Sequence, residues 1–232
     1  MTSDLLPRSE TSATYQQQAY DYVKGQITGL KLKPGQTLTD THIASDLKIS
    51  RTPVREALRR LEQEGLLVND SRRGWKVYSL SLDDIRQIFE LKQLLEGLIV
   101  EQAAACQEQD LRADLQEALK HMQQAAAAGN YEAWRLADSH LHLTLQRMSR
   151  NRRACAMVQS LDDQWFRLRA GYITLEGRMQ RSAREHAGIV ASLLSGPGGA
   201  TAAEHMRAHI DYVYHDLIDT LRLVMPFVQG NI

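Results

Sequence analysis

Residues 49–61 constrain this chain more than any other stretch, because they combine two opposed helix faces in one short segment. Arg51, Arg55 and Arg59 recur at every fourth position and therefore share one side of a helix. The opposite side is apolar and consists of Val54, Ala57, Leu58 and Leu61. Pro53 falls in the first turn, where its missing N–H costs nothing. The segment therefore predicts a helix that packs on one side and meets anions on the other.

Positive charge is concentrated in this part of the chain. The whole chain has 28 basic and 28 acidic residues, and residues 48–76 hold eight of the former against four of the latter. Because phosphate contacts dominate affinity for nucleic acids, a basic patch confined to one segment indicates a site for a polyanion. A solvated charged face is the alternative that charge alone leaves open.

Composition places the chain among ordinary globular proteins. Its 232 residues are enough for two modest domains, and 43% of them are hydrophobic. The longest apolar runs are shorter than a membrane span and residues 1–14 are too polar for a secretion signal, so we expect no membrane association and a cytoplasmic location. Cys106 and Cys155 lie far apart without a CxxC pattern, which fits a reducing compartment and predicts two packed thiols.

Three helices and a hairpin are predicted after a flexible tail over residues 1–14. The helices are expected over 15–30, from Thr39 or Asp40 to Leu47, and from Ile49 to Gly65, and the strands at 66–68 and 75–78. The tip of the hairpin, residues 71–74, carries two arginines. Three helices followed by a hairpin with a basic tip predict a winged helix-turn-helix over residues 15–78.

The residues of this region resemble the GntR family of bacterial transcription regulators. The match comprises Ser50-Arg51-Thr52-Pro53-Val54-Arg55-Glu56-Ala57-Leu58 and, around it, Lys33-Pro34-Gly35, Leu38, Ile43-Ala44, Leu61, Glu64-Gly65-Leu66 and Gly74. The resemblance implies a homodimer that binds a near-palindromic, double-stranded DNA operator. It further implies base contacts from Arg51 and Arg55, hydroxyl support from Ser50 and Thr52, phosphate contacts from Arg59, Arg72 and Arg73, and a wing that approaches DNA at Gly74.

The rest of the chain, after a short linker at 79–83, shows helical periodicity only. Helices are expected over 84–105, 110–128, 131–148, 152–175, 179–194 and 200–224. The clearest breaks are Gly129-Asn130 and the glycine cluster at 196–199. The fold class is therefore mostly α, with an all-helical antiparallel bundle over residues 84–225 behind the winged helix.

Four metal-ligating side chains lean toward the inside of this bundle. Asp138 and His142 lie four residues apart on the flank of one apolar stripe, whereas His140 faces the other way. His186 lies at the centre of the stripe of its helix, and His209 lies nearer the last inner stripe than His205 does. One carboxylate and three imidazoles suit a divalent metal of the zinc, nickel or manganese class. A core histidine that is merely hydrogen-bonded is the alternative at each position.

The same residues resemble a family signature. Asp138-Ser139-His140-Leu141-His142, Glu185-His186 with Ile189, and Met206-Arg207-Ala208-His209 are similar to the motifs of the FadR subfamily, with its all-helical FCD-type effector-binding domain, over about residues 84–222. The resemblance implies that Asp138, His142, His186 and His209 hold a metal, and that a small carboxylate effector binds beside it. The metal set points to the VanR-like branch rather than the acyl-CoA-binding branch.

Lys92 lies within an apolar stripe, where an ammonium needs an anion or a wet cavity. It is a candidate counter-ion for the effector, and a pairing with Glu96 or exposure of its amine to solvent is the alternative. Arg167, Arg169 and Tyr172 are further candidates for the effector cavity.

The sequence predicts a transcriptional regulator, in the family mostly a repressor, and not an enzyme. Two alternatives remain: a metal-dependent hydrolase with Glu185 as the nearest base, and a metal sensor without an organic effector. Glu185 neighbours His186 and so points about 100° away from it, and no HExxH spacing is present.

Overall fold

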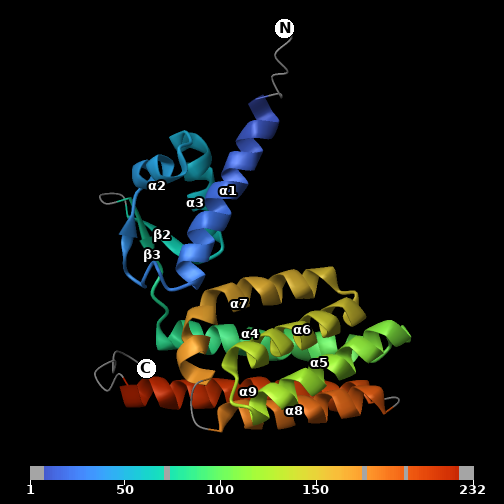
Figure 1. The fold of residues 1–232 in the computed structure, drawn as a ribbon. Helices are drawn as coiled ribbons and strands as arrows, with labels where there is room; N and C mark the ends of the chain where they lie inside the picture. The colour runs from blue at the N-terminus through green and yellow to red at the C-terminus, as the bar shows by residue number, and fades with distance from the viewer. Residues whose placement is uncertain (1–7, 71–73, 174–176, 196–197, 225–232) are drawn as a thin grey trace. The chain divides into compact units, whose positions relative to one another are not determined.

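The computed structural model describes residues 8–70, 74–173, 177–195 and 198–224, and it describes their side chains except at 8–12, 166–173 and 223–224. The chain divides after Ser81 into two compact units (Figure 1). We call them the winged-helix unit and the helical unit. No described helix is both long enough and apolar enough to cross a bilayer.

The winged-helix unit contains three helices and a small antiparallel sheet in its described residues. In chain order they are α1 (Arg8–Thr28), β1 (Thr37–Leu38), α2 (Asp40–Leu47), α3 (Arg51–Gln63), β2 (Leu67–Asp70) and β3 (Gly74–Val77). The strand order is β1-β3-β2, with Leu38 opposite Trp75 and Val68 opposite Lys76. The predicted winged helix is confirmed, and the short strand β1 is an addition that periodicity did not indicate.

Helix α1 begins at Arg8, so the prediction of a tail is wrong for residues 8–14. The prediction relied on an apolar stripe, which these residues lack. A helix can extend beyond its packed part without such a stripe, because each added residue gains a backbone hydrogen bond once the helix is nucleated. Residues 1–7 lie outside the description.

The two-faced character of residues 49–61 is realised in α3. Its apolar side chains are fully buried, at 0% exposure for Val54, Ala57, Leu58 and Leu61. They pack in a core with residues of α1 and the sheet, including Ile27 and Leu67. The arginines of the other face are exposed. Burial of one face therefore fixes which side of α3 meets solvent.

The helical unit consists of long helices in its described residues. They are α4 (Leu82–Ala103), α5 (Gln109–Ala127), α6 (Tyr131–Ser149), α7 (Arg152–Ile173), α8 (Arg178–Leu194) and α9 (Gly199–Val224). Figure 1 shows them lying side by side, and α4 packs against α9, α6 and α7, while α8 packs against α9 and α5. The expected bounds agree to within a few residues, and residues 174–176 lie outside the description.

The break before α6 illustrates why these bounds were predictable. Gly129 adopts a φ of +66°, which glycine tolerates best. The side chain of Asn130 then accepts a hydrogen bond of 3.1 Å from the N–H of Ala133 and caps α6.

Candidate functional site

The exposed face of α3 presents the arginines that the sequence singles out. The side chains of Arg51 and Arg55 are 59% and 57% exposed, and Arg59 and Thr52 are exposed as well. Ser50 occupies the N-cap position of α3, but its hydroxyl makes no capping hydrogen bond. Its hydroxyl is therefore not committed to the helix end.

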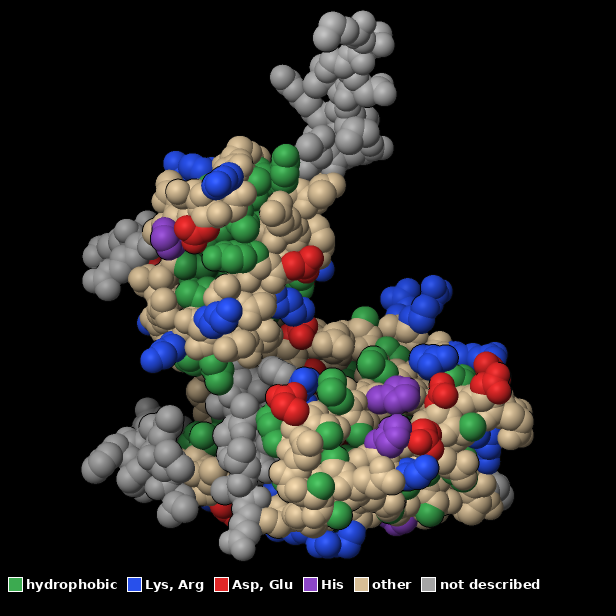
Figure 2. Space-filling view, viewed as in Figure 1, with side chains coloured by type: hydrophobic (Ala, Val, Ile, Leu, Met, Phe, Trp, Pro, Cys, Tyr) green, Lys and Arg blue, Asp and Glu red, His purple; other side chains and the backbone are tan. Residues whose placement is uncertain are grey.

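The wing starts at Gly74, and its backbone explains the need for glycine. Gly74 has a φ of +93°, and a Cβ there would lie 2.9 Å from the carbonyl oxygen of Leu38. Strand β3 therefore approaches β1 more closely than any side-chain-bearing residue would allow. Arg72 and Arg73, at the tip, lie outside the described residues. Figure 2 shows Lys and Arg side chains at several places on the visible face of this unit.

One carboxylate on α2 engages both arginines predicted to contact bases. Nη2 of Arg51 lies 3.1 Å from both carboxylate oxygens of Asp40, and Nε of Arg55 lies 3.4 Å from one of them. The sequence interpretation considered Asp40 only as a helix cap, and Thr39 takes that role by accepting from the N–H of His42. The arginine spacing of four gave no sign of a shared acidic partner on another helix.

In the helical unit, the predicted metal ligands converge from three helices. Ligand nitrogens of His142, His186 and His209 all lie within 4.8 Å of one another. Nε2 of His142 and Nε2 of His186 are 3.1 Å apart, and Oδ1 of Asp138 lies 3.9 Å and 3.7 Å from these two atoms. Asp138, His186 and His209 are buried, and His142 is partly exposed. The predicted directions hold elsewhere too, since His140 and His205 are exposed.

The second nitrogen of each imidazole meets a hydrogen-bond acceptor. Nδ1 of His142 lies 3.1 Å from Glu96, Nδ1 of His186 lies 2.8 Å from the carbonyl oxygen of Ser182, and Nδ1 of His209 lies 2.6 Å from Glu185. Carboxylate and carbonyl oxygens only accept, so these partners assign the proton to Nδ1 of each ring. Each ring is then left with an unprotonated Nε2 unless it carries a second proton.

The electrostatics of the cluster separate the three rings. Burial, together with the charge of His209, lowers the pKa of His186 to about 3. Burial also lowers the pKa of His209, against the opposing effect of Glu185. Burial disfavours the charged form of His142 too, but the hydrogen bond and charge of Glu96 outweigh it and raise its pKa. Without a metal, His142 is therefore the ring that holds an extra proton and donates it to Nε2 of His186.

Lys92 is buried and paired, as the alternative interpretation expected. Its Nζ lies 2.6 Å from Glu96 and also contacts Asp162 of α7. Burial alone would lower the pKa of Lys92, but Asp162 and Glu96 outweigh it and raise the pKa above its usual range. The other proposed effector contacts, Arg167 and Arg169 with Tyr172, have side chains outside the description.

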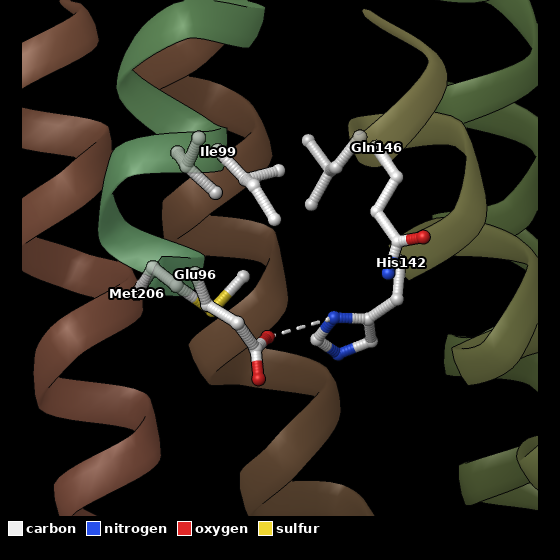
Figure 3. Close-up of a pocket in the computed structure, with 7 residues that line it drawn as sticks. Glu96, Ile99, His142, Gln146 and Met206 are labelled. Carbon is white, nitrogen blue, oxygen red and sulfur yellow. Dashed lines mark ion pairs between the residues drawn. The ribbon is translucent and has the colours of Figure 1, made fainter. Parts of the chain in front are cut away.

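Glu96 reaches His142 across a very small cavity between α4 and α6. Figure 3 shows its carboxylate and the imidazole of His142 pointing toward one another. The cavity has a volume of about 10 Å³ and is also bordered by Gln146 and Met206. This is about the space of one water molecule. Glu96 lies one turn after Lys92, which is the sequence signal that links it to the site.

Glu185 is held by a buried arginine. Arg178, at 1% exposure, donates to both oxygens of Glu185 at 3.0 Å each. Burial would raise the pKa of Glu185, but its hydrogen bonds from His209 and Arg178 lower it to about 2. A carboxylate engaged in this way is a poor general base, which weighs against the hydrolase alternative. Arg178 lies two turns before Glu185, and nothing in its spacing marked it as buried.

Comparison with known proteins covers both units. Residues 15–77 match the family described as bacterial regulatory proteins, gntR family, and residues 87–212 match the FCD domain. The HTH-type transcriptional regulator YdhC of Bacillus subtilis is 30% identical over 200 residues, which are 85% of this chain and 88% of that protein. The Nta operon transcriptional regulator of Aminobacter aminovorans is 29% identical over 194 residues, or 82% and 88% of the two chains.

Solved structures show the same fold. Escherichia coli McbR/YncC superposes with a TM-score of 0.68 at 24% identity, covering 90% of this chain and 98% of the other. The family and these relatives are transcriptional regulators, which confirms the prediction that the protein is not an enzyme. The chain therefore belongs to the GntR family of bacterial regulatory proteins and carries an FCD domain behind its winged helix.

Proposed function

We propose that this protein is a homodimeric transcriptional repressor whose operator affinity changes when a small organic acid binds at a metal ion in the FCD domain. Asp138, His142, His186 and His209 would hold the metal. The observation that carries the proposal is the convergence of three imidazoles, each with its Nδ1 bound to an acceptor and its Nε2 left for the cluster. Repression is the sign of control that the family resemblance implies.

The donor set fits a divalent cation. Two unprotonated Nε2 atoms 3.1 Å apart repel one another unless a proton or a cation lies between them. Imidazole and carboxylate ligands suit zinc, nickel and manganese, and outer acceptors such as Glu96 and Glu185 orient such ligands. When bound, the metal would supply a positive charge that attracts a carboxylate. The protein's own residues orient the rings and exclude water.

An organic acid requires this pocket to widen. The cavity beside His142 holds about 10 Å³, which is too little for a carboxylate. Free and bound forms must then differ in the packing of α4 against α6, on which the cavity lies. A ligand shifts a protein between two states only when it binds them unequally, so this difference is what the proposed control needs.

On the DNA side, α3 would enter the major groove, with Arg51 and Arg55 contacting bases and Arg59 contacting phosphate. Ser50, Thr52 and the wing would support it, with Arg72, Arg73 and Gly74 near the backbone or minor groove. Two copies would read a near-palindrome. The exposure of the arginines on a helix with a buried opposite face supports this role.

The test begins with DNA that the wild-type protein selects from a random-sequence library. Arg51→Ala should weaken binding to the selected duplex by about 1–3 kcal/mol more than binding to a scrambled duplex. Equal weakening on both would make Arg51 a phosphate contact only.

The same selected duplex tests control by the FCD domain. Binding is measured with zinc, with a chelator, and with a panel of di- and tricarboxylic acids in each case. An acid that changes affinity only in the metal-loaded protein supports the proposal. A response to metal with no response to any acid would favour the metal-sensor alternative, and a protein that binds no metal would overturn the metal site.

A further inference from the structure

We propose that Asp40 sets the sequence specificity of this protein, by holding Arg51 and Arg55 in place for base contacts and away from random phosphates. The inference rests on the proposed DNA-reading role of α3. It adds an acidic residue outside the reading helix to the determinants of recognition.

The geometry places one carboxylate between the two arginines. Both oxygens of Asp40 accept from Nη2 of Arg51 at 3.1 Å, and one of them lies 3.4 Å from Nε of Arg55. The side chain of Asp40 is only 15% exposed, whereas those of the arginines are more than half exposed. The carboxylate is therefore the fixed member of the group, and the guanidinium groups are its mobile partners.

Asp40 is fixed because three elements meet beside it. It is the first residue of α2, and its neighbour Thr39 caps that helix. Leu38, two residues earlier, pairs with Trp75 of the wing and has its carbonyl oxygen against Gly74. The start of the wing, the start of α2 and the reading face of α3 are thus joined at this carboxylate.

The contacts leave the arginines able to read bases. An arginine has five N–H donors, and Arg51 uses only Nη2 here, while Arg55 uses Nε. The remaining donors can make the paired hydrogen bonds that distinguish guanine from other bases. Those contacts can form without breaking the pairing with Asp40.

Contacts with random DNA are affected differently. A long, flexible arginine that is free can reach a phosphate in any register of the duplex. An arginine held by Asp40 must leave its partner to do so, and the negative carboxylate itself repels phosphate. Asp40 therefore weakens binding to random DNA more than binding to the operator, and this difference is specificity.

The test compares Asp40→Asn with wild type on the selected duplex and on its scrambled version. The ratio of the two dissociation constants should fall by about tenfold, mainly through tighter binding of the scrambled duplex. On scrambled DNA, the slope of log K against log salt concentration should steepen by about 0.9 for each arginine that gains a phosphate. Asp40→Glu, which keeps a carboxylate, should retain most of the ratio.

Asp46→Asn is the matched control. Asp46 lies on the same helix and its loss changes the net charge equally, but its ion-pair partner is His42 at 3.7 Å. If Asp40→Asn and Asp46→Asn tighten binding to both duplexes equally, only net charge is involved and the proposal is wrong.

Two further outcomes are separated. Thermal unfolding shows whether Asp40→Asn is folded, and Asp40→Ser, with a hydroxyl in the first turn of α2, replaces it in the same comparison if it is not. A wild-type protein that selects no sequence, or an Arg51→Ala variant with normal operator affinity, overturns the DNA-reading role itself. Loss of operator binding in Arg51→Ala with an unchanged ratio in Asp40→Asn or Asp40→Ser overturns only the role of Asp40.

Discussion

At the scale of single residues, each imidazole of the cluster has one nitrogen committed to an acceptor, and this decides what the other nitrogen can bind. His186 shows the effect most clearly, because burial and the charge of His209 lower its pKa to about 3. It is therefore neutral at physiological pH, with its lone pair directed at His142. A neutral ring with a fixed tautomer is the form that binds a metal.

The partner of His209 should be needed for tight metal binding. Glu185→Gln removes the negative charge that accepts from Nδ1 of His209, while an amide oxygen remains for Arg178. We expect zinc affinity to fall by about 10–100-fold, in the range typical for outer-shell partners. Competition with a chromophoric chelator measures it. Glu204→Gln, an exposed change on α9, is the control, and equal affinities in the two variants would contradict the prediction.

Metal affinity should rise with pH. The pKa of His142 is raised, because Glu96 outweighs the effect of burial, so the metal-free ring keeps its second proton to a higher pH. A metal must displace this proton, which costs most below that pKa and nothing above it. Zinc affinity should therefore increase by about tenfold per pH unit and then level off. Glu96→Gln should move the rise to lower pH. A flat profile between about pH 6 and pH 8 would show that no proton is released.

At the scale of elements, the approach of β3 to β1 depends on a missing side chain. Gly74→Ala adds a Cβ 2.9 Å from the carbonyl oxygen of Leu38 at a φ of +93°. We expect a loss of about 1–3 kcal/mol in the stability of the winged-helix unit and weaker operator binding. Hydrogen exchange of the wing amides and operator titrations measure the two effects.

Gly129→Ala separates backbone strain from close contact. Gly129 also has a positive φ, of +66°, but a Cβ there meets nothing within 4 Å. This variant should lose only the strain of its own loop and keep normal operator affinity. Wild-type operator binding in Gly74→Ala would show that the wing tolerates displacement.

Helix α4 carries an exposed apolar face that we expect to form part of the dimer interface. Leu91, Leu94 and Leu98, spaced by three and four residues, are 45%, 65% and 36% exposed. Figure 2 shows hydrophobic side chains among polar ones on the visible face of the helical unit. Leu94→Glu should convert dimer into monomer in analytical ultracentrifugation, because it buries a charge in an apolar contact. Tyr212→Glu, an exposed change on α9, should leave the dimer intact. A dimeric Leu94→Glu variant would place the interface elsewhere.

At the scale of the whole molecule, control depends on the chain between β3 and α4. Strand β3 ends at Val77 and α4 begins at Leu82, so residues 78–81 join the wing to a helix that supplies Lys92 and Glu96. A short connection transmits movement better than a flexible one, because a long linker samples many geometries. Binding at the FCD domain should therefore reach the reading heads through this segment.

A flexible insertion tests this route. Gly-Ser-Gly-Ser placed after Ser79 should leave metal affinity unchanged, and operator affinity should no longer respond to metal or acid. Operator titrations with and without zinc, beside a chelator competition, measure both properties. A full response in the insertion variant would mean that control acts through another contact.

The sequence by itself determined the elements and the direction of their faces. The spacing of Arg51, Arg55 and the apolar residues between them fixed α3, and the stripes around His186 and His209 fixed which histidines turn inward. Periodicity is a local property, so a helix of 3.6 residues per turn reports its own buried side without knowledge of its neighbours.

Only the tertiary structure decided which polar groups meet. Asp40 with Arg51, Glu96 with His142, and Glu185 with His209 join residues of different helices. These pairings depend on how helices pack and rotate against one another, which periodicity does not encode. The size of the cavity beside His142 depends on the same packing. The sequence therefore identified the residues, and the packing of the helices assigned their partners.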